Sequence, residues 1–168
     1  RAQFKVSLIA IDRQGRWHLQ EESQLGKFVA AEGPQLALLP GNETGQIIRL
    51  DNGQPIEQPD AIFLILHGPM GEDGTVQGLL RTLELPFVGP DVLGSSVAMD
   101  KDVAKRLLRE AGLNVARGIV VHAHERDSLD YGKLTRQFGS PIFVKPANMG
   151  SSVGVHKVKT ADQFAAAI

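Results

Sequence analysis

Residues 61–66 (Ala-Ile-Phe-Leu-Ile-Leu) form a continuous apolar segment that runs directly into a glycine-rich turn. A strand covered on both faces of a parallel sheet has this pattern, because neither of its faces meets water. After the turn, residues 67–74, apolar residues recur at helical spacing over residues 75–83. The stripe consists of Val76, Leu79, Leu80 and Leu83. A buried strand followed by an amphipathic helix predicts an α/β fold.

Strand-like and helix-like segments alternate through the rest of the chain. Strands are expected at residues 4–11, 17–20, 86–89, 115–122, 142–145 and 155–158, with short ones at 37–39 and 47–50 within the loop-rich region 21–60. Helices are expected at residues 101–110, 129–138 and 161–168. The apolar face of the first helix comprises Val103, Leu107, Leu108 and Ala111, with Gly112 as its cap. The predicted strands before about residue 95 are separated by long loops, whereas helices and strands follow one another closely after it. This change predicts a domain boundary near residue 95.

Composition argues against several classes of function. The 168 residues are 42% hydrophobic and 22% charged, which is typical of a globular protein with its own core. The net charge is −1, so nucleic acid is not a favoured partner. There are no cysteines, which excludes disulfides and thiolate metal sites. No apolar segment approaches the ~20 residues that a membrane span needs.

A strand-end lysine and a glycine–serine loop together indicate an anion site. Lys145 follows the apolar Phe143-Val144, where an ammonium group is costly unless it meets an anion or water. Five residues later, Gly150–Gly154 can turn several N–H groups and two hydroxyls toward one anion. The loop lacks the ending of a P-loop, and alone it fits an exposed turn better. Joined to Lys145, it favours phosphate binding.

His67 and Lys101 are weaker candidates. His67 follows the apolar strand, at the strand end where α/β sheets bind ligands, and a ligand contact and a plain loop histidine are equally compatible with that position. Glu72 and Asp73 are better explained as helix-start residues. Lys101 follows the expected N-cap Asp100, where a cation is unfavourable unless an anion lies nearby; a solvated lysine is the simpler alternative.

In their order and spacing, these motifs resemble those of D-alanine–D-alanine ligases, members of the ATP-grasp superfamily. The matching runs are His67-Gly68 with Gly71-Glu72-Asp73-Gly74, Met99-Asp100-Lys101, and Phe143-Val144-Lys145-Pro146 with Gly150-Ser151-Ser152-Val153-Gly154. The resemblance covers essentially the whole chain. It implies a Rossmann-like N-terminal domain at residues 1–95, without its first strand, followed by an incomplete central ATP-grasp domain at residues 96–168. The chain is expected to be truncated at both ends.

The resemblance also implies an activity and its residues. ATP would phosphorylate one D-alanine, and the amine of a second would attack the acyl phosphate, for peptidoglycan synthesis in the cytoplasm. His67 would bind the first D-alanine, and Ser151 would be catalytic. The nucleotide would contact Lys101, Phe143, Lys145, Ser151, Ser152 and Val153. The Mg²⁺ ligands, the adenine pocket and a substrate-orienting glutamate would lie outside this chain, which alone would be inactive, and the enzyme would be a homodimer.

Three alternatives stay open. One is another ATP-grasp ligase with a different acid or amine, such as a D-alanine–D-lactate ligase. The second is a nucleotide-binding module without catalysis. The third is an α/β protein that binds a sugar or an amino acid and no nucleotide.

Overall fold

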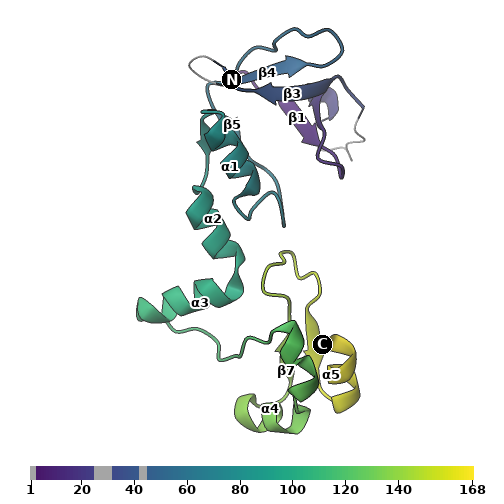
Figure 1. Ribbon diagram of the computed structural model, residues 1–168, viewed down its shortest axis with the longest axis vertical. Coiled ribbons are helices and arrows are strands. Elements are labelled where there is room, and N and C mark those ends of the chain that lie inside the picture. The colour runs from purple at the N-terminus through teal and green to yellow at the C-terminus, as the bar shows by residue number, and fades with distance from the viewer. Residues whose placement is uncertain (1–2, 25–31, 42–44) are drawn as a thin grey trace. The chain divides into compact units, whose positions relative to one another are not determined.

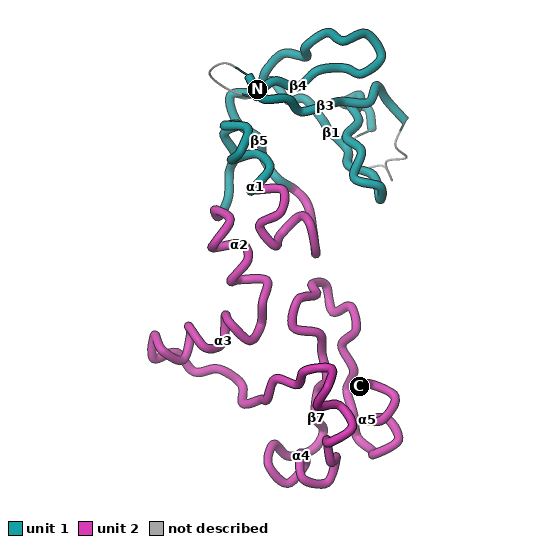
Figure 2. Tube along the Cα trace, in the orientation of Figure 1, with its two compact units in different colours: residues 1–64, 78–89 teal, residues 65–77, 90–168 magenta. Residues whose placement is uncertain are grey.

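The computed structural model describes residues 3–24, 32–41 and 45–168, and the chain divides into two compact units. Unit 1 comprises residues 1–64 and 78–89, and unit 2 comprises residues 65–77 and 90–168 (Figure 2). Parts of the expected loop-rich region, residues 25–31 and 42–44, lie outside the described residues. The boundary near residue 95 falls within a helix of unit 2, and the division into domains at that point stays a prediction.

Unit 1 contains a four-stranded antiparallel sheet in the order β1-β2-β3-β4 (Figure 1). Its strands are β1 Leu8–Ile11, β2 Trp17–Gln20, β3 Gln35–Leu39 and β4 Gln46–Arg49, and a short 3-10 helix, η1, spans Glu22–Gln24. The expected strands are confirmed, although β1 is shorter than residues 4–11. Asp12 shapes the β1–β2 turn, because its Oδ1 accepts hydrogen bonds from the N–H groups of Gln14 and Arg16, each at 2.9 Å.

The core of unit 1 joins the start of β4 to the segment after the first α-helix. Ile47 and Leu80 are fully buried, and Leu83 and Leu85 are nearly so. The Gly45 N–H donates to the Leu83 carbonyl oxygen at 2.6 Å, and a Cβ at position 45 would lie 2.5 Å from that oxygen. Only glycine permits this approach. Because burying one such side chain contributes about 1.5–3 kcal/mol, this small cluster accounts for much of the local stability.

The apolar segment 61–66 forms a strand that is shorter and less covered than expected. β5 is Ile62–Phe63, α1 is Thr75–Thr82 and β6 is Phe87–Val88. β5 and β6 pair in parallel, as the α/β pattern predicts. However, Phe63 and Ile65 are 70% and 72% exposed, and the expectation of a strand buried on both faces is wrong. The reason is that the sheet has two strands in the described part of the chain. Leu79 is also exposed, unlike its stripe neighbours Val76 and Leu80.

Unit 2 consists mainly of helices and one β-hairpin. Its elements are α2 Val92–Met99, α3 Lys101–Glu110, η2 Ala123–Ser128, α4 Tyr131–Phe138, β7 Ile142–Val144, β8 His156–Val158 and α5 Ala161–Ala167. The predicted helices and the two strands around the glycine–serine loop are confirmed within one or two residues. The sequence did not predict α2, because Gly94-Ser95-Ser96 at its centre are poor helix formers. Asp91 caps it by accepting from the Val92 N–H.

One other expectation for unit 2 is wrong, and one helix differs from the usual packing of an amphipathic helix. Residues 115–122 form no strand, because no described segment pairs with them. The helix α3 forms as expected, with Gly112 at φ +76° just beyond its end, but its apolar face is not buried. Leu107 is 52% exposed, and Val103 and Leu108 are about 40% exposed, so α3 forms through its caps and helical propensity and not through core packing.

The hairpin of β7 and β8 gives the glycine–serine loop a firm base. The two strands are antiparallel, with Ile142 opposite Val158. Val158 and Phe164 of α5 are buried, and the Phe164 and Tyr131 rings lie 5.7 Å apart. The loop from Lys145 to Val155 therefore connects two strands that are packed against α5 (Figure 1). Within the described residues, no helix is both long and apolar enough to cross a membrane.

Candidate functional site

The N-terminus of α3 is built around Asp100, which confirms the predicted cap. Its Oδ1 accepts hydrogen bonds from the N–H groups of Asp102 at 2.9 Å and Val103 at 3.0 Å. The Val103 hydrogen bond is the main cause that lowers the pKa of Asp100; burial works against it, and the N–H of Asp102, the side chain of Asn148 and the charge of Arg106 reinforce it. Asp100 is thus held ionised at the start of the helix.

Lys101 is anchored to the strand-loop segment that follows β7. Its Nζ donates to the carbonyl oxygen of Ala147 at 3.2 Å and to that of Met149, and its backbone N–H donates to Ala147 at 3.1 Å. The ammonium group of Lys101, which is unfavourable at a helix N-terminus, is thus stabilised by carbonyl oxygens. The structure therefore places Lys101 directly beside the backbone that leads into Gly150.

Lys145 and Phe143 lie on the same exposed side of the chain at the end of β7. Phe143 is 61% exposed, and Lys145 is two residues further on, where the alternation of a strand repeats. The charge of Lys145 reaches Lys105 on α3: burial lowers the pKa of Lys105, and the charges of Lys145 and then Arg109 lower it further. The N-terminal half of α3 and the segment that follows Lys145 are neighbours in unit 2, because the side chain and the backbone N–H of Lys101 both donate to the Ala147 carbonyl oxygen.

The serine loop, defined as residues 150–154, is a tight turn with an unusual backbone. Ser151 and Ser152 have φ angles of +50° and +60°, and Gly154 has +69°. The Val153 N–H donates to the Gly150 carbonyl oxygen at 3.0 Å. Left-handed conformations cost a non-glycine residue about 1–2 kcal/mol each, so the loop stores strain at its two hydroxyl residues. Ser151, Ser152 and Val153 are all exposed and accessible to a ligand.

The turn that carries His67 is held by the two acidic residues that precede α1. Glu72 Oε2 accepts from the Gly68 N–H at 2.5 Å, and its Oε1 lies 4.0 Å from His67 Nδ1. Asp73 accepts from the Met70 and Thr75 N–H groups at 2.8 and 3.0 Å. Burial acts to raise the pKa of Asp73, but the hydrogen bonds together hold it below its usual value. Both acids are thus helix-start residues, as expected, and Glu72 additionally faces His67.

The His67 turn and the serine loop meet at Gly150. A Cβ at position 150 would lie 3.7 Å from Glu72 Oε2 and from Gly68 Cα. Together with the Lys101 anchor, this contact brings the His67 turn, the start of α3 and the serine loop into one neighbourhood of unit 2. The sequence motifs identify all three segments but not Lys105 or the Glu72–Gly150 contact. The i, i+4 spacing of Lys101 and Lys105 places both on one helix face, but by itself it does not distinguish Lys105 from an ordinary helix lysine.

The described residues provide no metal centre. In these parts of the chain, no group of three or more His, Cys, Asp or Glu side chains is arranged to hold a metal ion. The carboxylates of the segments above accept hydrogen bonds from backbone N–H groups or from Arg106; they are Asp100, Asp102, Asp73 and Glu72. The donor set therefore does not fit a resident Mg²⁺ site.

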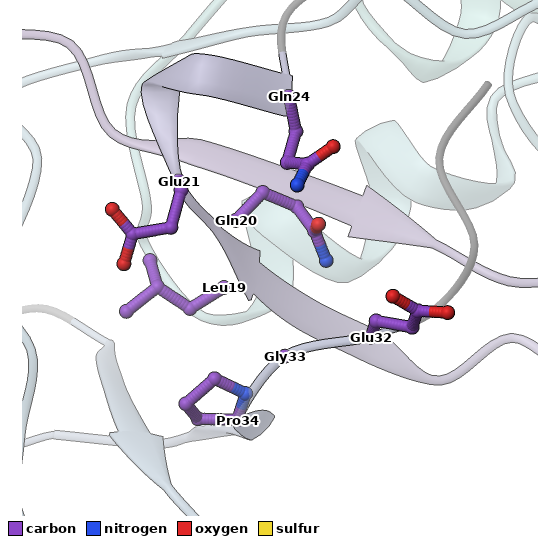
Figure 3. Close-up of a pocket in the computed structure, with 7 residues that line it drawn as sticks. All are labelled: Leu19, Gln20, Glu21, Gln24, Glu32, Gly33 and Pro34. Atoms are coloured by element: carbon purple, nitrogen blue, oxygen red, sulfur yellow. The ribbon is translucent and has the colours of Figure 1, made fainter. Parts of the chain in front are cut away.

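A separate pocket lies in unit 1, between β2 and the approach to β3 (Figure 3). Its volume is about 440 Å³, and it is lined by Leu19, Gln20, Glu21, Gln24, Glu32, Gly33 and Pro34. The buried Gln20 Nε2 has no hydrogen-bond partner among the residues that the structure describes. None of the predicted site residues lines this pocket.

The family models and the curated relatives that match this chain all point to the same family. Residues 1–90 match the family described as D-ala D-ala ligase N-terminus, and residues 107–168 match D-ala D-ala ligase C-terminus. The D-alanine–D-alanine ligase of Oceanobacillus iheyensis is 45% identical over 98% of this chain and 47% of its own length. D-alanine–D-alanine ligase A of Escherichia coli K12 is 46% identical over 100% of this chain and 48% of its own length.

Solved structures show the same fold. The D-alanine–D-alanine ligase from Coxiella burnetii superposes with a TM-score of 0.79 at 33% identity, covering 96% of this chain and 48% of its own. The VanG D-Ala:D-Ser ligase from Enterococcus faecalis superposes with a TM-score of 0.73 at 28% identity, covering 99% of this chain and 49% of its own. The α/β fold with an N-terminal ligase domain and part of an ATP-grasp fold is thereby confirmed. The chain, which spans about half the length of these relatives, belongs to the D-alanine–D-alanine ligase family.

Proposed function

We propose that the protein of which this chain is part joins two D-alanines to D-alanyl-D-alanine at the expense of ATP, supplying peptidoglycan precursors in the cytoplasm. One observation carries the proposal beyond the family match: Lys101 is bonded to the backbone that leads into the serine loop, and Gly150 of that loop adjoins the His67 turn. Cations, loop N–H groups and the histidine are therefore close enough to serve one substrate pair.

In this proposal, Lys101 and Lys145 contact the ATP phosphates, and Ser151, Ser152 and Val153 close over them. Phe143 lines the nucleotide side, on the same exposed edge as Lys145. Ammonium groups and loop donors neutralise charge on the transferring phosphoryl group, which is the main demand of phosphoryl transfer. The exposure of the serine loop and its strained serines suit a segment that moves when nucleotide binds.

The reaction would proceed in two steps. A carboxylate oxygen of the first D-alanine attacks the terminal phosphorus of ATP, and ADP leaves. The neutral amine of the second D-alanine then attacks the acyl carbon, its nitrogen gives up one proton, and inorganic phosphate leaves with the C–O bond electrons. His67 would hold the first D-alanine, and the Ser151 hydroxyl would donate a hydrogen bond in the reacting region. Mg²⁺, bound by residues outside this chain, would neutralise phosphate charge.

A second candidate differs only in the second substrate. The similarity to a D-Ala:D-Ser ligase keeps a hydroxyl-bearing acceptor open, since the fold of this chain is common to both activities. We further propose a homodimer, on the resemblance to the family. The acceptor is best identified from the products of the complete enzyme.

The decisive experiment uses the complete protein with ATP, Mg²⁺ and D-alanine, alone or with D-serine or D-lactate. Mass spectrometry should detect D-alanyl-D-alanine with one ADP formed per dipeptide, and Lys145→Ala should abolish this while the fold persists. A mixed product with D-serine or D-lactate as the main species would support the second candidate. Nucleotide binding without any dipeptide would instead support a module without catalysis.

A further inference from the structure

Lys105 lies one helical turn beyond Lys101 on α3. Residues at i and i+4 are neighbours on a helix surface, so the two side chains share one face. Lys101 places that face against the carbonyl oxygens of Ala147 and Met149. The charge of Lys145, two residues before Ala147, acts on Lys105. Lys101 and Lys105 thus lie on one face of α3, and Lys145 lies two residues before a carbonyl oxygen to which Lys101 donates.

The partners of these ammonium groups are neutral. Lys105 Nζ donates to the carbonyl oxygen of Ala116 at 2.9 Å, just as Lys101 donates to carbonyl oxygens. Over the described residues, no carboxylate forms an ion pair with Lys101, Lys105 or Lys145. The adjacent Asp102 binds Arg106 instead. In the described part of the chain, none of the three ammonium groups is therefore paired with a carboxylate.

Lys105 also has donors to spare. An ammonium group carries three N–H bonds, and the Ala116 carbonyl takes one of them. The remaining two can bind the oxygens of an anion without breaking the contact with Ala116. Burial and the charges of Lys145 and Arg109 both disfavour the charged form of Lys105 in the free protein, and a polyanion would relieve that cost.

We propose that Lys105 is a third cation of the nucleotide site and binds the phosphate groups of a nucleoside triphosphate together with Lys101 and Lys145. The inference rests on the proposed function, because it assigns Lys105 to the same substrate. It adds a residue that the family resemblance does not assign, and it explains why the described residues give this ammonium group a carbonyl oxygen as its partner and no carboxylate.

The test compares Lys105→Gln with the wild-type complete protein. Glutamine can still donate to the Ala116 carbonyl but carries no charge. Isothermal titration with AMP, ADP and ATP should show a loss of affinity that grows with phosphate number and reaches about tenfold for ATP, as expected for one charged hydrogen bond. Lys105→Arg should restore most of the affinity. The exposed Lys133 of α4, changed to Met, is the matched control and should have no effect.

The outcomes separate this inference from the proposed function. Unchanged ATP affinity in Lys105→Gln would overturn the inference. An equal loss of affinity for all three nucleotides, with a lower melting temperature of the free protein, would also overturn it. That result would mean that Lys105 only holds the segment around Ala116 in place. If the wild-type protein binds no ATP, the proposed function itself fails.

Discussion

The ammonium group of Lys101 donates a hydrogen bond to the carbonyl oxygen of Met149, the residue immediately before the serine loop. A second bond, to Ala147 at 3.2 Å, fixes the same segment. The first turn of α3 and the root of the loop are thereby joined although they are far apart in the sequence. Any ligand that draws Lys101 away would release the loop root, so the proposed nucleotide binding at Lys101 would be coupled to the position of the loop.

Changing Lys101 to Met should free the loop root. The backbone amides of residues 150–154 should then exchange hydrogen faster, because two carbonyl anchors are lost while the Asp100 cap remains. Hydrogen exchange followed by mass spectrometry on the complete protein measures this directly. Lys133→Met serves as the control. Equal protection of the loop in both variants would mean that the hairpin alone holds it.

Changing Ser151 to Ala should lower the turnover number more than the stability. The side chain is exposed and contributes little packing, whereas loss of one hydrogen-bond donor at a reacting centre typically costs about 100-fold in rate. Steady-state kinetics at saturating ATP and D-alanine, set beside the melting temperature, separates the two effects. A normal turnover number would remove Ser151 from the chemistry.

Changing Gly154 to Ala should disturb the loop through two effects. Its φ of +69° disfavours any side chain by about 1–2 kcal/mol, and the new Cβ would lie 2.8 Å from Pro146 Cγ. Gly15 is the matched control, since its φ is +78° but nothing lies within 4 Å of its Cβ position. We expect Gly154→Ala to lower the melting temperature further than Gly15→Ala and to raise the KM for ATP. Similar melting temperatures of the two variants would show that Pro146 can move to make room for the new Cβ.

Local chemistry explains which parts of the fold the sequence predicted. Asp100, Thr160 and Gly112 act within a few residues of their own position, so the limits of α3 and the start of α5 could be predicted. The parallel pairing of β5 and β6 followed from an apolar strand and a helix in succession. Whether Phe63 is buried depends on what else covers the strand, and no local pattern contains that information.

The same distinction applies to the candidate site. The motifs around His67, Lys101 and Lys145 are visible because each lies at the end of a strand or helix, where ligands tend to bind. The bond from Lys101 to Met149 is a long-range contact, and the sequence suggested an anion for that lysine where the structure has carbonyl oxygens. Lys105 appears in the sequence as an ordinary helix lysine. Only its three-dimensional neighbours distinguish it.

The β1–β2 turn of unit 1 should be sensitive to acid through Asp12. Its oxygens accept from the Gln14 and Arg16 N–H groups and from Arg16 Nε at 2.6 Å, and Oδ2 lies 3.5 Å from His18 Nε2. Burial acts to raise the pKa of Asp12, but the hydrogen bonds from Arg16 and Gln14 and the Arg16 charge lower it from 3.8 to about 2.

Because the folded-state pKa of Asp12 lies below the unfolded value, its contribution to stability is complete above pH 3.8 and is lost as the pH falls toward about 2. Asp12→Asn keeps one acceptor oxygen for the turn but removes the charge, so the melting temperature should depend less steeply on pH across that interval. Asp127→Asn in η2 removes an equal charge and should leave the slope unchanged. Carboxyl ¹³C NMR provides a second measurement: a titration midpoint of Asp12 near its ordinary value would mean that the Arg16 contacts do not hold the carboxylate in solution.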